Sequence, residues 1–160
     1  MIDTLWFGHT VGKRAEPDFF ALRQADGSFL LKSNAQLPQG MYALITKRSS
    51  GANLQHTPCW LADGQRKFAV KADYTQLFNT IAFTGSAENE TLYAYLRGYQ
   101  ELTDRLDVVT DNWKEALDQP TFEAKKAVEQ ALQQFQSDFM RSHHGTLTSK
   151  LVEQTFFLLP

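Results

Sequence analysis

The chain is poor in the residues that define several common classes of protein. Cys59 is the one cysteine among 160 residues, so an internal disulfide and CxxC redox chemistry are excluded within this chain. No apolar run approaches the ~18 residues that a membrane helix needs, and we expect no membrane insertion. Sixteen basic against eighteen acidic residues give a net charge of −2. That balance argues against a nucleic-acid partner, because proteins of that class gather a basic excess on one face.

Two signals for location and cofactor binding are also missing. The opening residues 1–5 show no basic segment followed by an apolar stretch, so they contain no signal peptide. We therefore expect either a cytoplasmic protein or a piece that begins after its signal. Neither a P-loop motif nor a dinucleotide-binding GxGxxG motif occurs, which excludes those phosphate-binding loops. No cofactor is expected.

Residues 1–84 are predicted to form a β-rich domain. Asp26-Gly27 and Asp63-Gly64 are typical of tight turns, because glycine accepts the positive φ that such turns require. The polar stretch 47–57 is expected to be a loop. Short apolar runs between these points predict five to seven strands, over residues 5–7, 19–23, 28–32, 41–45, 59–61, 67–71 and 80–83. Strands at this spacing are typical of an antiparallel β-sandwich or a partly open barrel.

Residues 85–160 are predicted to form a helical region that packs on itself and on the sheet. Apolar residues recur every three or four positions from Leu92 to Leu106, and Ser86 is suited to be the N-cap of that helix. Residues 111–117 are expected to add a helical turn or two. The fold class is therefore predicted to be α+β, with about three helices after the β-rich domain.

The boundaries of the later helices rest on local signals. Asp118 shortly before Pro120 is typical of a helix start, and Gly145 is suited to end that helix. A last short helix is expected over residues 148–158.

Cys59 is the first candidate for catalysis, as a nucleophile. A reactive thiolate needs a base or a positive environment, and His56 is three residues away. In an extended strand that spacing places the two side chains on opposite faces. A buried, inert thiol is therefore favoured, and an enzyme that uses Cys59 is the third of three hypotheses.

The remaining ionisable residues predict neither a catalytic nor a metal site on this chain. His143 and His144 are adjacent on a helix, where side chains project about 100° apart and rarely bind one metal. Asp104, Asp107 and Asp111 follow a spacing typical of a solvated helix face.

The aromatic content offers an alternative function. The chain has 12 Phe, 5 Tyr and 3 Trp, most of which we expect in the core. Exposed rings standing side by side would instead form a binding site for a small ligand or a glycan, for which the candidates are Tyr42, Trp60, Tyr93 and Tyr99. A glycosylation sequon at Asn89 is attributed to chance, because it falls at a helix start.

Three segments carry a resemblance to a known family. They are Asp26-Gly27-Ser28-Phe29, residues 38–42 with Pro38, Gly40 and Tyr42, and residues 85–89 with Gly85, Ser86, Glu88 and Asn89. In this order they resemble the N-terminal region of envelope-located thioredoxin-like thiol-disulfide oxidoreductases of Gram-negative bacteria. That region is β-rich and then helical, and it precedes a thioredoxin-fold domain that carries CxxC. The resemblance covers residues 19–106, and the later helices share only its general character.

The resemblance implies a non-catalytic module that serves partner docking, positioning or dimerisation. The thioredoxin domain is absent here, and residue 160 falls about where a linker to it is expected. Redox activity would then belong to that C-terminal thioredoxin-like domain of the same polypeptide, which is the implied partner together with a second copy of the module. The resemblance also implies a location in the periplasm or cell envelope. None of the matching motifs is catalytic, so no functional residue is carried over.

Overall fold

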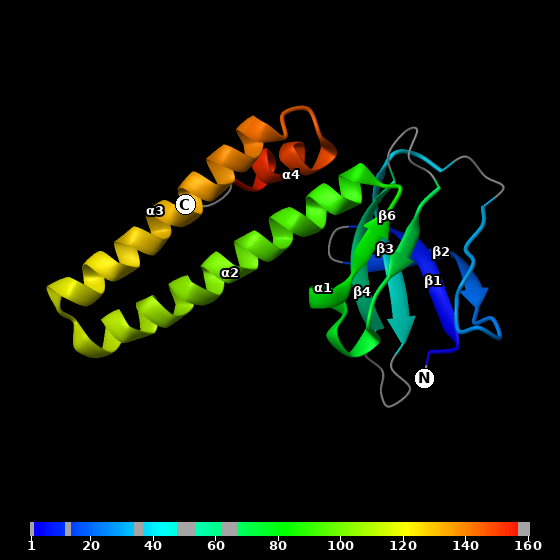
Figure 1. Ribbon diagram of the computed structural model, residues 1–160, viewed down its shortest axis with the longest axis horizontal. Helices are drawn as coiled ribbons and strands as arrows, with labels where there is room; N and C mark the ends of the chain where they lie inside the picture. Colours follow the sequence, from blue (N-terminus) through cyan, green and yellow to red (C-terminus); the bar gives the residue numbers. More distant parts are fainter. Residues whose placement is uncertain (1, 12–13, 34–36, 48–53, 62–66, 157–160) are drawn as a thin grey trace. The chain divides into compact units, whose positions relative to one another are not determined.

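The computed structural model describes residues 2–11, 14–33, 37–47, 54–61 and 67–156. It is an α+β protein with a four-stranded antiparallel sheet and a two-stranded sheet, followed by two long helices and a shorter one (Figure 1). The chain divides into two compact units, residues 1–89 and 90–160. The expected turn at Asp63-Gly64 lies outside the described residues.

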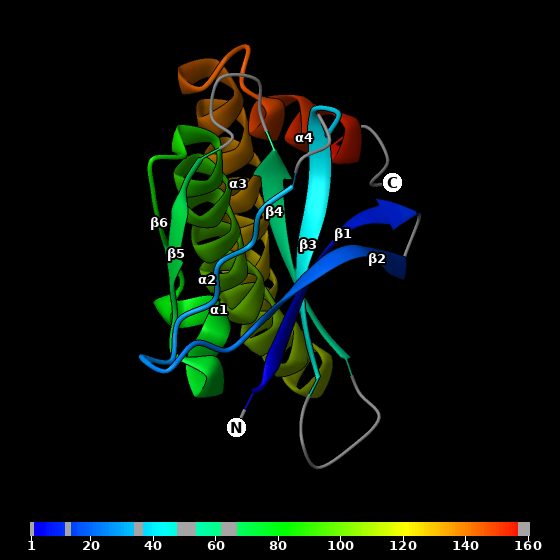
Figure 2. The same cartoon turned by 90° about the vertical axis from the view of Figure 1, so that its right-hand side faces the viewer.

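The first unit is built on the four-stranded sheet, whose strand order is β2-β1-β3-β4 (Figure 2). Every neighbouring pair in it is antiparallel. The strands are β1 (Thr4–Val11), β2 (Arg14–Leu22), β3 (Gly40–Lys47) and β4 (Leu54–Leu61). The prediction of a loop over 47–57 is wrong at both ends, because Lys47 belongs to β3 and residues 54–57 belong to β4; residues 48–53 lie outside the described residues.

The second sheet pairs β5 (Ala69–Lys71) with β6 (Ala82–Thr84), with the short helices η1 (Tyr74–Gln76) and α1 (Leu77–Thr80) between them. Neither sheet closes on itself among the residues described, so a barrel or a sandwich is not confirmed. Ile81, which links α1 to β6, and Phe83 in β6 are buried.

One predicted strand, over residues 28–32, does not form. The turn before it does, with Gly27 at a φ of 87°. The Asp26 carboxylate accepts hydrogen bonds from the Ser28 N–H at 2.9 Å and from its hydroxyl at 2.7 Å, and Gln24 N–H donates to Ser28 C=O at 2.8 Å. These contacts satisfy the backbone locally. The segment that follows leaves the turn without pairing to β2, and β2 remains an edge strand.

Both faces of the four-stranded sheet carry buried side chains: Ala43, Ile45 and Trp60 lie on one face, and a larger cluster lies on the other. Phe7 pairs with Leu44 and Tyr42 pairs with Cys59, and all four side chains are buried. Because side chains alternate along a strand, these cross-strand partners share a face. The Phe7 ring stacks on Tyr42 with centroids 5.0 Å apart and lies 5.2 Å from Phe19.

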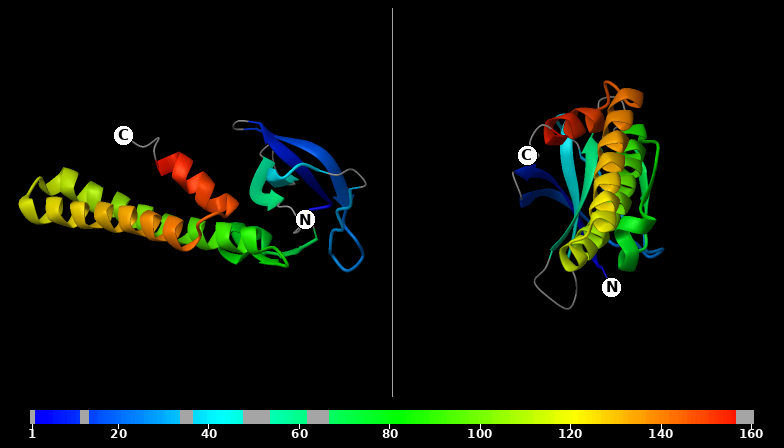
Figure 3. Two further views of the ribbon diagram at one scale, coloured as in Figure 1. Left: turned by 90° about the horizontal axis from the view of Figure 1, so that it is seen from above. Right: turned by 90° about the vertical axis from the view of Figure 1, so that its left-hand side faces the viewer.

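The second unit is a pair of long antiparallel helices followed by a short one (Figure 3). The helices are α2 (Ala87–Ala116), which begins in the first unit, α3 (Gln119–Ser142) and α4 (Leu147–Phe156). The extra turns expected over 111–117 are the end of one continuous helix of 30 residues. Asp118 is the N-cap of α3 as predicted, and Gly145 follows the helix end at a φ of 89°.

Aromatic residues hold the long helices together. Tyr95, Phe139 and Val152 form the buried cluster, and the Tyr95 ring lies 4.7 Å from that of Phe139 and 5.6 Å from that of Phe135. Gly98 lets Phe135 approach, since a Cβ at this position would stand 2.6 Å from the ring. The helix pair is therefore packed tightly at the level of Gly98.

Candidate functional site

Cys59 is placed where burial disfavours a reactive thiolate. The side chain lies on β4 in the core and has 0% exposure. Burial disfavours the charged thiolate and raises the pKa of Cys59 to about 12. Nucleophilic and metal-binding chemistry both require the thiolate. The structure confirms that the thiol is buried, as the sequence favoured.

The four candidate ring residues do not form a shared exposed platform. Tyr42, Trp60 and Tyr93 are 5%, 8% and 3% exposed, and Tyr99 is half-buried. The Tyr42 hydroxyl donates to the Pro38 carbonyl at 3.1 Å, and the Tyr99 ring stacks on Tyr95. A ligand platform requires at least two exposed rings side by side, and these four residues do not supply one.

Two of the histidines make local contacts. His9 and Asp18 form a pair that sequence reasoning missed: the His9 Nδ1 lies 2.9 Å from Asp18 Oδ1, and the His9 N–H donates to Asp18 Oδ2 at 3.0 Å. The pair sits beside the irregularity in the β1–β2 ladder at Phe7/Gly8, which a sequence pattern does not reveal.

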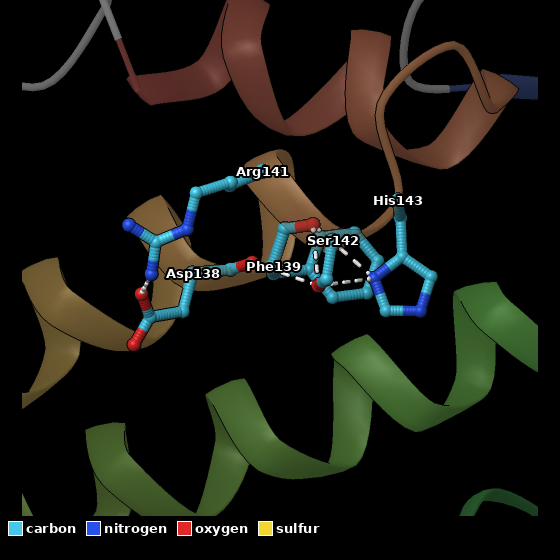
Figure 4. Close-up of polar contacts among 5 residues, drawn as sticks. All are labelled: Asp138, Phe139, Arg141, Ser142 and His143. Atoms are coloured by element: carbon cyan, nitrogen blue, oxygen red, sulfur yellow. Dashed lines mark hydrogen bonds and ion pairs between the residues drawn. The ribbon is translucent and has the colours of Figure 1, made fainter.

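His143 is the C-cap of α3. Its Nδ1 lies 3.0 Å from Ser142 Oγ and 3.2 Å from the Phe139 carbonyl oxygen, and its ring stacks on Phe139 at 4.3 Å (Figure 4). Beside it, Arg141 pairs with Asp138 on the same helix. Within the described part of the chain, no three His, Cys, Asp or Glu side chains are placed to hold a metal ion.

The carboxylates of α2 lie on a solvated helix face, as the spacing predicted. Asp104 and Asp107 are exposed, and Asp104 accepts from Gln100 Nε2 at 2.6 Å. Asp111 pairs with Lys114 at 3.1 Å. Each of the two hydrogen-bonded carboxylates contacts a neighbour one turn away, which is usual for exposed helix residues.

The turn between α2 and α3 presents apolar side chains to solvent. We call Leu117 and Phe122 the apolar tip; they are 73% and 42% exposed. Leu117 also has a φ of 50°, the left-handed conformation that favours glycine or asparagine at the end of a helix. The ring of Phe122, in the apolar tip, lies 6.1 Å from the ring of Trp113 on α2. The sequence pattern placed Leu117 in a helix and missed both features.

The outer edge of β2 is a second exposed apolar surface. Phe20 is 61% exposed and Leu22 is 64% exposed. The Arg23 N–H donates to the Asp3 carbonyl on the β1 side, so alternation turns the backbone groups of Phe20 and Leu22 away from β1. Because β2 is the last strand of the sheet order, these groups face the open edge.

Comparison with protein-family models, with curated proteins and with solved structures finds no match for this chain. None of the described helices is both long and apolar enough to cross a membrane.

Proposed function

We propose that this chain is a non-catalytic docking module, the N-terminal part of a thiol-disulfide oxidoreductase, which holds a thioredoxin-like domain or its client protein. The observation that carries the proposal is the apolar tip, where Leu117 combines an exposed leucine side chain with a left-handed backbone. The motif resemblance at residues 26–29, 38–42 and 85–89 supports the choice of partner. It also supports a location in the periplasm or cell envelope, which we include in the proposal.

Leu117 is unfavourable in two respects, its left-handed backbone and its exposed apolar side chain, and both suit a binding site. A left-handed conformation costs an L-residue about 1–2 kcal/mol, and glycine avoids most of that cost. A leucine side chain left in water also forgoes the gain of burial, which is about 1.5–3 kcal/mol for a full side chain. Strained residues of this kind gather at sites of function. A bound partner would recover the burial term, and we infer that the leucine is kept for that contact.

Local contacts at the start of α3 support the turn that carries the apolar tip. Such contacts favour specific recognition over nonspecific adhesion. The Asp118 side chain accepts from the Thr121 N–H at 2.9 Å and so caps α3 directly after Leu117. The Lys125 Nζ lies 5.6 Å from the centre of the Trp113 ring. A preorganised surface loses less entropy on binding than a flexible one.

Photo-crosslinking tests the docking site. A photoreactive phenylalanine analogue is placed at position 117 in the natural full-length protein, and the adducts are identified by mass spectrometry. We expect adducts with a thioredoxin-fold domain from position 117. The matched control places the analogue at Gln130, which is exposed on α3 away from the turn. The same adducts from both positions, or none with a thioredoxin fold, would contradict the proposal.

The variant Leu117→Asn separates binding from stability. Asparagine tolerates the left-handed backbone, so the variant is expected to unfold at equal or higher denaturant concentration than the natural chain. It removes the apolar contact, so the yield of adducts from an analogue at position 122 should fall several-fold. A variant that is as stable as the natural chain and crosslinks equally well would show that Leu117 does not dock the partner.

A further inference from the structure

Helix α3 presents one uncharged face to solvent, opposite the side that packs in the core. Its buried residues are Val128, Gln136 and Phe139. The side chains about half a turn away from these point outward, because an α-helix has 3.6 residues per turn. Between Lys126 and Asp138 every exposed side chain is uncharged, and the same six residues line an open groove. We call these six residues the outer face of α3: Ala127, Gln130, Ala131, Gln133, Gln134 and Ser137.

The outer face has the composition of an interface centre. Such centres are depleted in charged residues, whereas their rims are polar and solvent-accessible. Charged residues stand at both ends of the outer face, with Glu123 and Lys126 before it and Asp138 and Arg141 after it. Positions 123 and 141 differ by 18, which is five turns of 3.6 residues, so Glu123 and Arg141 project from the same side of the helix.

We propose that a second copy of this chain docks on the outer face, with the two α3 helices antiparallel and the two-fold axis at position 132. Positions whose numbers add up to 264 then lie at the same level, so Glu123 of each copy faces Arg141 of the other. Gln130 and Gln134 meet in the same way beside the axis, and their amides can both donate and accept hydrogen bonds. A two-fold contact of this kind is self-complementary and closes at two copies.

The charges favour an antiparallel second copy over a parallel one. Each end of the antiparallel contact gathers two acidic and two basic side chains: Glu123 and Lys126 of one copy with Asp138 and Arg141 of the other. A parallel pair would instead set Glu123 against Glu123 and Arg141 against Arg141. Like charges in contact disfavour such a pair.

Glu123 and Arg141 can each hold a second partner. Arg141 pairs with Asp138 on its own helix, but a guanidinium has five N–H donors in a fixed fork. The Oε1 atom of Glu123 accepts from Gln119 Nε2 at 2.7 Å, which leaves Oε2 for the arginine of the other copy. The contact between copies therefore adds to the pairs within each helix and does not require that they break.

This contact goes beyond the docking function and uses a different surface from the apolar tip, so the two proposals fail independently. A polar contact along one helix is small, and small interfaces are weak. Ion pairs at its exposed ends are screened by salt. We therefore expect a rapid monomer–dimer equilibrium that shifts toward dimer with protein concentration and toward monomer with added salt. A photoreactive analogue at Gln130 should then capture a second copy of the chain.

Sedimentation velocity across a hundred-fold range of protein concentration tests self-association. We expect the weight-average sedimentation coefficient of the natural chain to rise with concentration. Glu123→Arg and Arg141→Glu each bring like charges together at both ends of the contact, so each variant alone should stay at the monomer value. The matched control Glu101→Arg makes the same charge change at an exposed position of α2 and should associate as the natural chain does. A natural chain that stays monomeric throughout would overturn the proposal.

Mixing the two variants separates the effect of charge from an effect on folding. In an equal mixture, a copy that is basic at both ends meets a copy that is acidic at both ends, so we expect the dimer to return. The double variant Glu123→Arg/Arg141→Glu exchanges the two charges and should also dimerise. Single variants that associate as well as the natural chain would point to a parallel pair or another surface and would overturn the proposal. So would a mixture that stays monomeric.

Discussion

The side-chain amide of Asn89 makes the hydrogen bonds to Trp60 that a neighbouring strand would make. Its Oδ1 accepts from the Trp60 N–H at 2.5 Å, and its Nδ2 donates to the Trp60 carbonyl at 2.9 Å and to Ser86 Oγ at 2.8 Å. Trp60 lies on β4, the edge strand opposite β2, and Asn89 is fully buried. The first turn of α2 thus satisfies one position of an edge that would otherwise be left open.

Replacing Asn89 by alanine is expected to destabilise the first unit strongly. The change leaves the Trp60 N–H and C=O buried with no partner from this side chain, and each such group costs about 1–3 kcal/mol. We expect a loss of roughly 2–4 kcal/mol in the free energy of unfolding, measured by chemical denaturation. A loss under about 0.5 kcal/mol would show that water or another group replaces the amide.

Two further variants control this result. Asn89→Asp keeps one acceptor but places a second oxygen against the Trp60 carbonyl, so it should destabilise at least as much near neutral pH. Thr91→Ala removes the glycosylation sequon without touching Asn89 and should have little effect. Because the Asn89 side chain is buried and hydrogen-bonded, the folded chain should carry no glycan there in a glycosylating host.

The Asn89 contact shows what sequence reasoning recovered and what it did not. Residues 85–89 stood out as a family pattern, and Ser86 was predicted at the helix start, where α2 indeed begins at Ala87. The partner of the pattern is 29 positions away on β4. Helix starts, stops and periodicity are decided by neighbours within a few residues, which is why Asp118 and Gly145 were predicted correctly.

Strand pairing and exposure depend on distant residues and were predicted less well. Residues 28–32 contain a short apolar run directly after an Asp-Gly turn, which predicts a strand, yet the contacts of Asp26 with Ser28 hold the chain in a local turn. The rings of Tyr42 and Trp60 have no sequence signal that separates core from surface, and the fold buries both. The left-handed Leu117 was missed because the residue usually found there is glycine or asparagine.

We expect that position 98 requires glycine, because the ring of Phe135 packs against it. In Gly98→Ala the new Cβ would stand 2.6 Å from that ring, which is itself stacked on Tyr95 and is not free to swing away. Overpacking of this kind costs about 1–3 kcal/mol, whereas alanine gains about 1 kcal/mol over glycine in a helix. We expect a net loss of stability of up to about 2 kcal/mol in thermal or chemical unfolding.

The background Phe135→Leu provides the control for Gly98. A smaller side chain removes the clash and leaves only the helix propensity, so Gly98→Ala should then be stabilising by about 1 kcal/mol. A double-mutant cycle measures this reversal directly. Equal effects of Gly98→Ala on stability in both backgrounds would show that the added methyl group does not clash with the Phe135 ring.

Asp118 should make the start of α3 sensitive to acid. Hydrogen bonds from the Thr121 hydroxyl and from the Thr121 N–H hold the pKa of Asp118 below its usual range. A carboxyl group with a lowered pKa contributes stability above its unfolded pKa and loses it as the pH falls through the folded one. We expect an NMR titration of the Asp118 carboxyl to give a midpoint below that of an unstructured aspartate. In Thr121→Ala, which removes the hydroxyl alone, the midpoint should move part of the way back; no movement would exclude the hydroxyl as a cause.

Cys59 is expected to destabilise the fold at alkaline pH. Burial raises its pKa from 9.0 to about 12, so the thiol stays protonated in the folded chain while the unfolded chain releases the proton. Its contribution is therefore fully present below about pH 9 and is lost as the pH rises toward 12, by about 1.4 kcal/mol per pH unit.

Comparison with Cys59→Ala isolates this effect, because tyrosines and lysines titrate alike in both chains. The difference in unfolding free energy between the natural chain and the variant should shrink with that slope above pH 9, and parallel curves would contradict the assignment. The same burial predicts the alkylation rate: an iodoacetamide reagent should modify the thiol in proportion to the unfolded fraction as denaturant is added. Rapid labelling in native buffer, at the rate of a free peptide thiol, would place Cys59 at the surface and return the catalytic hypothesis to consideration.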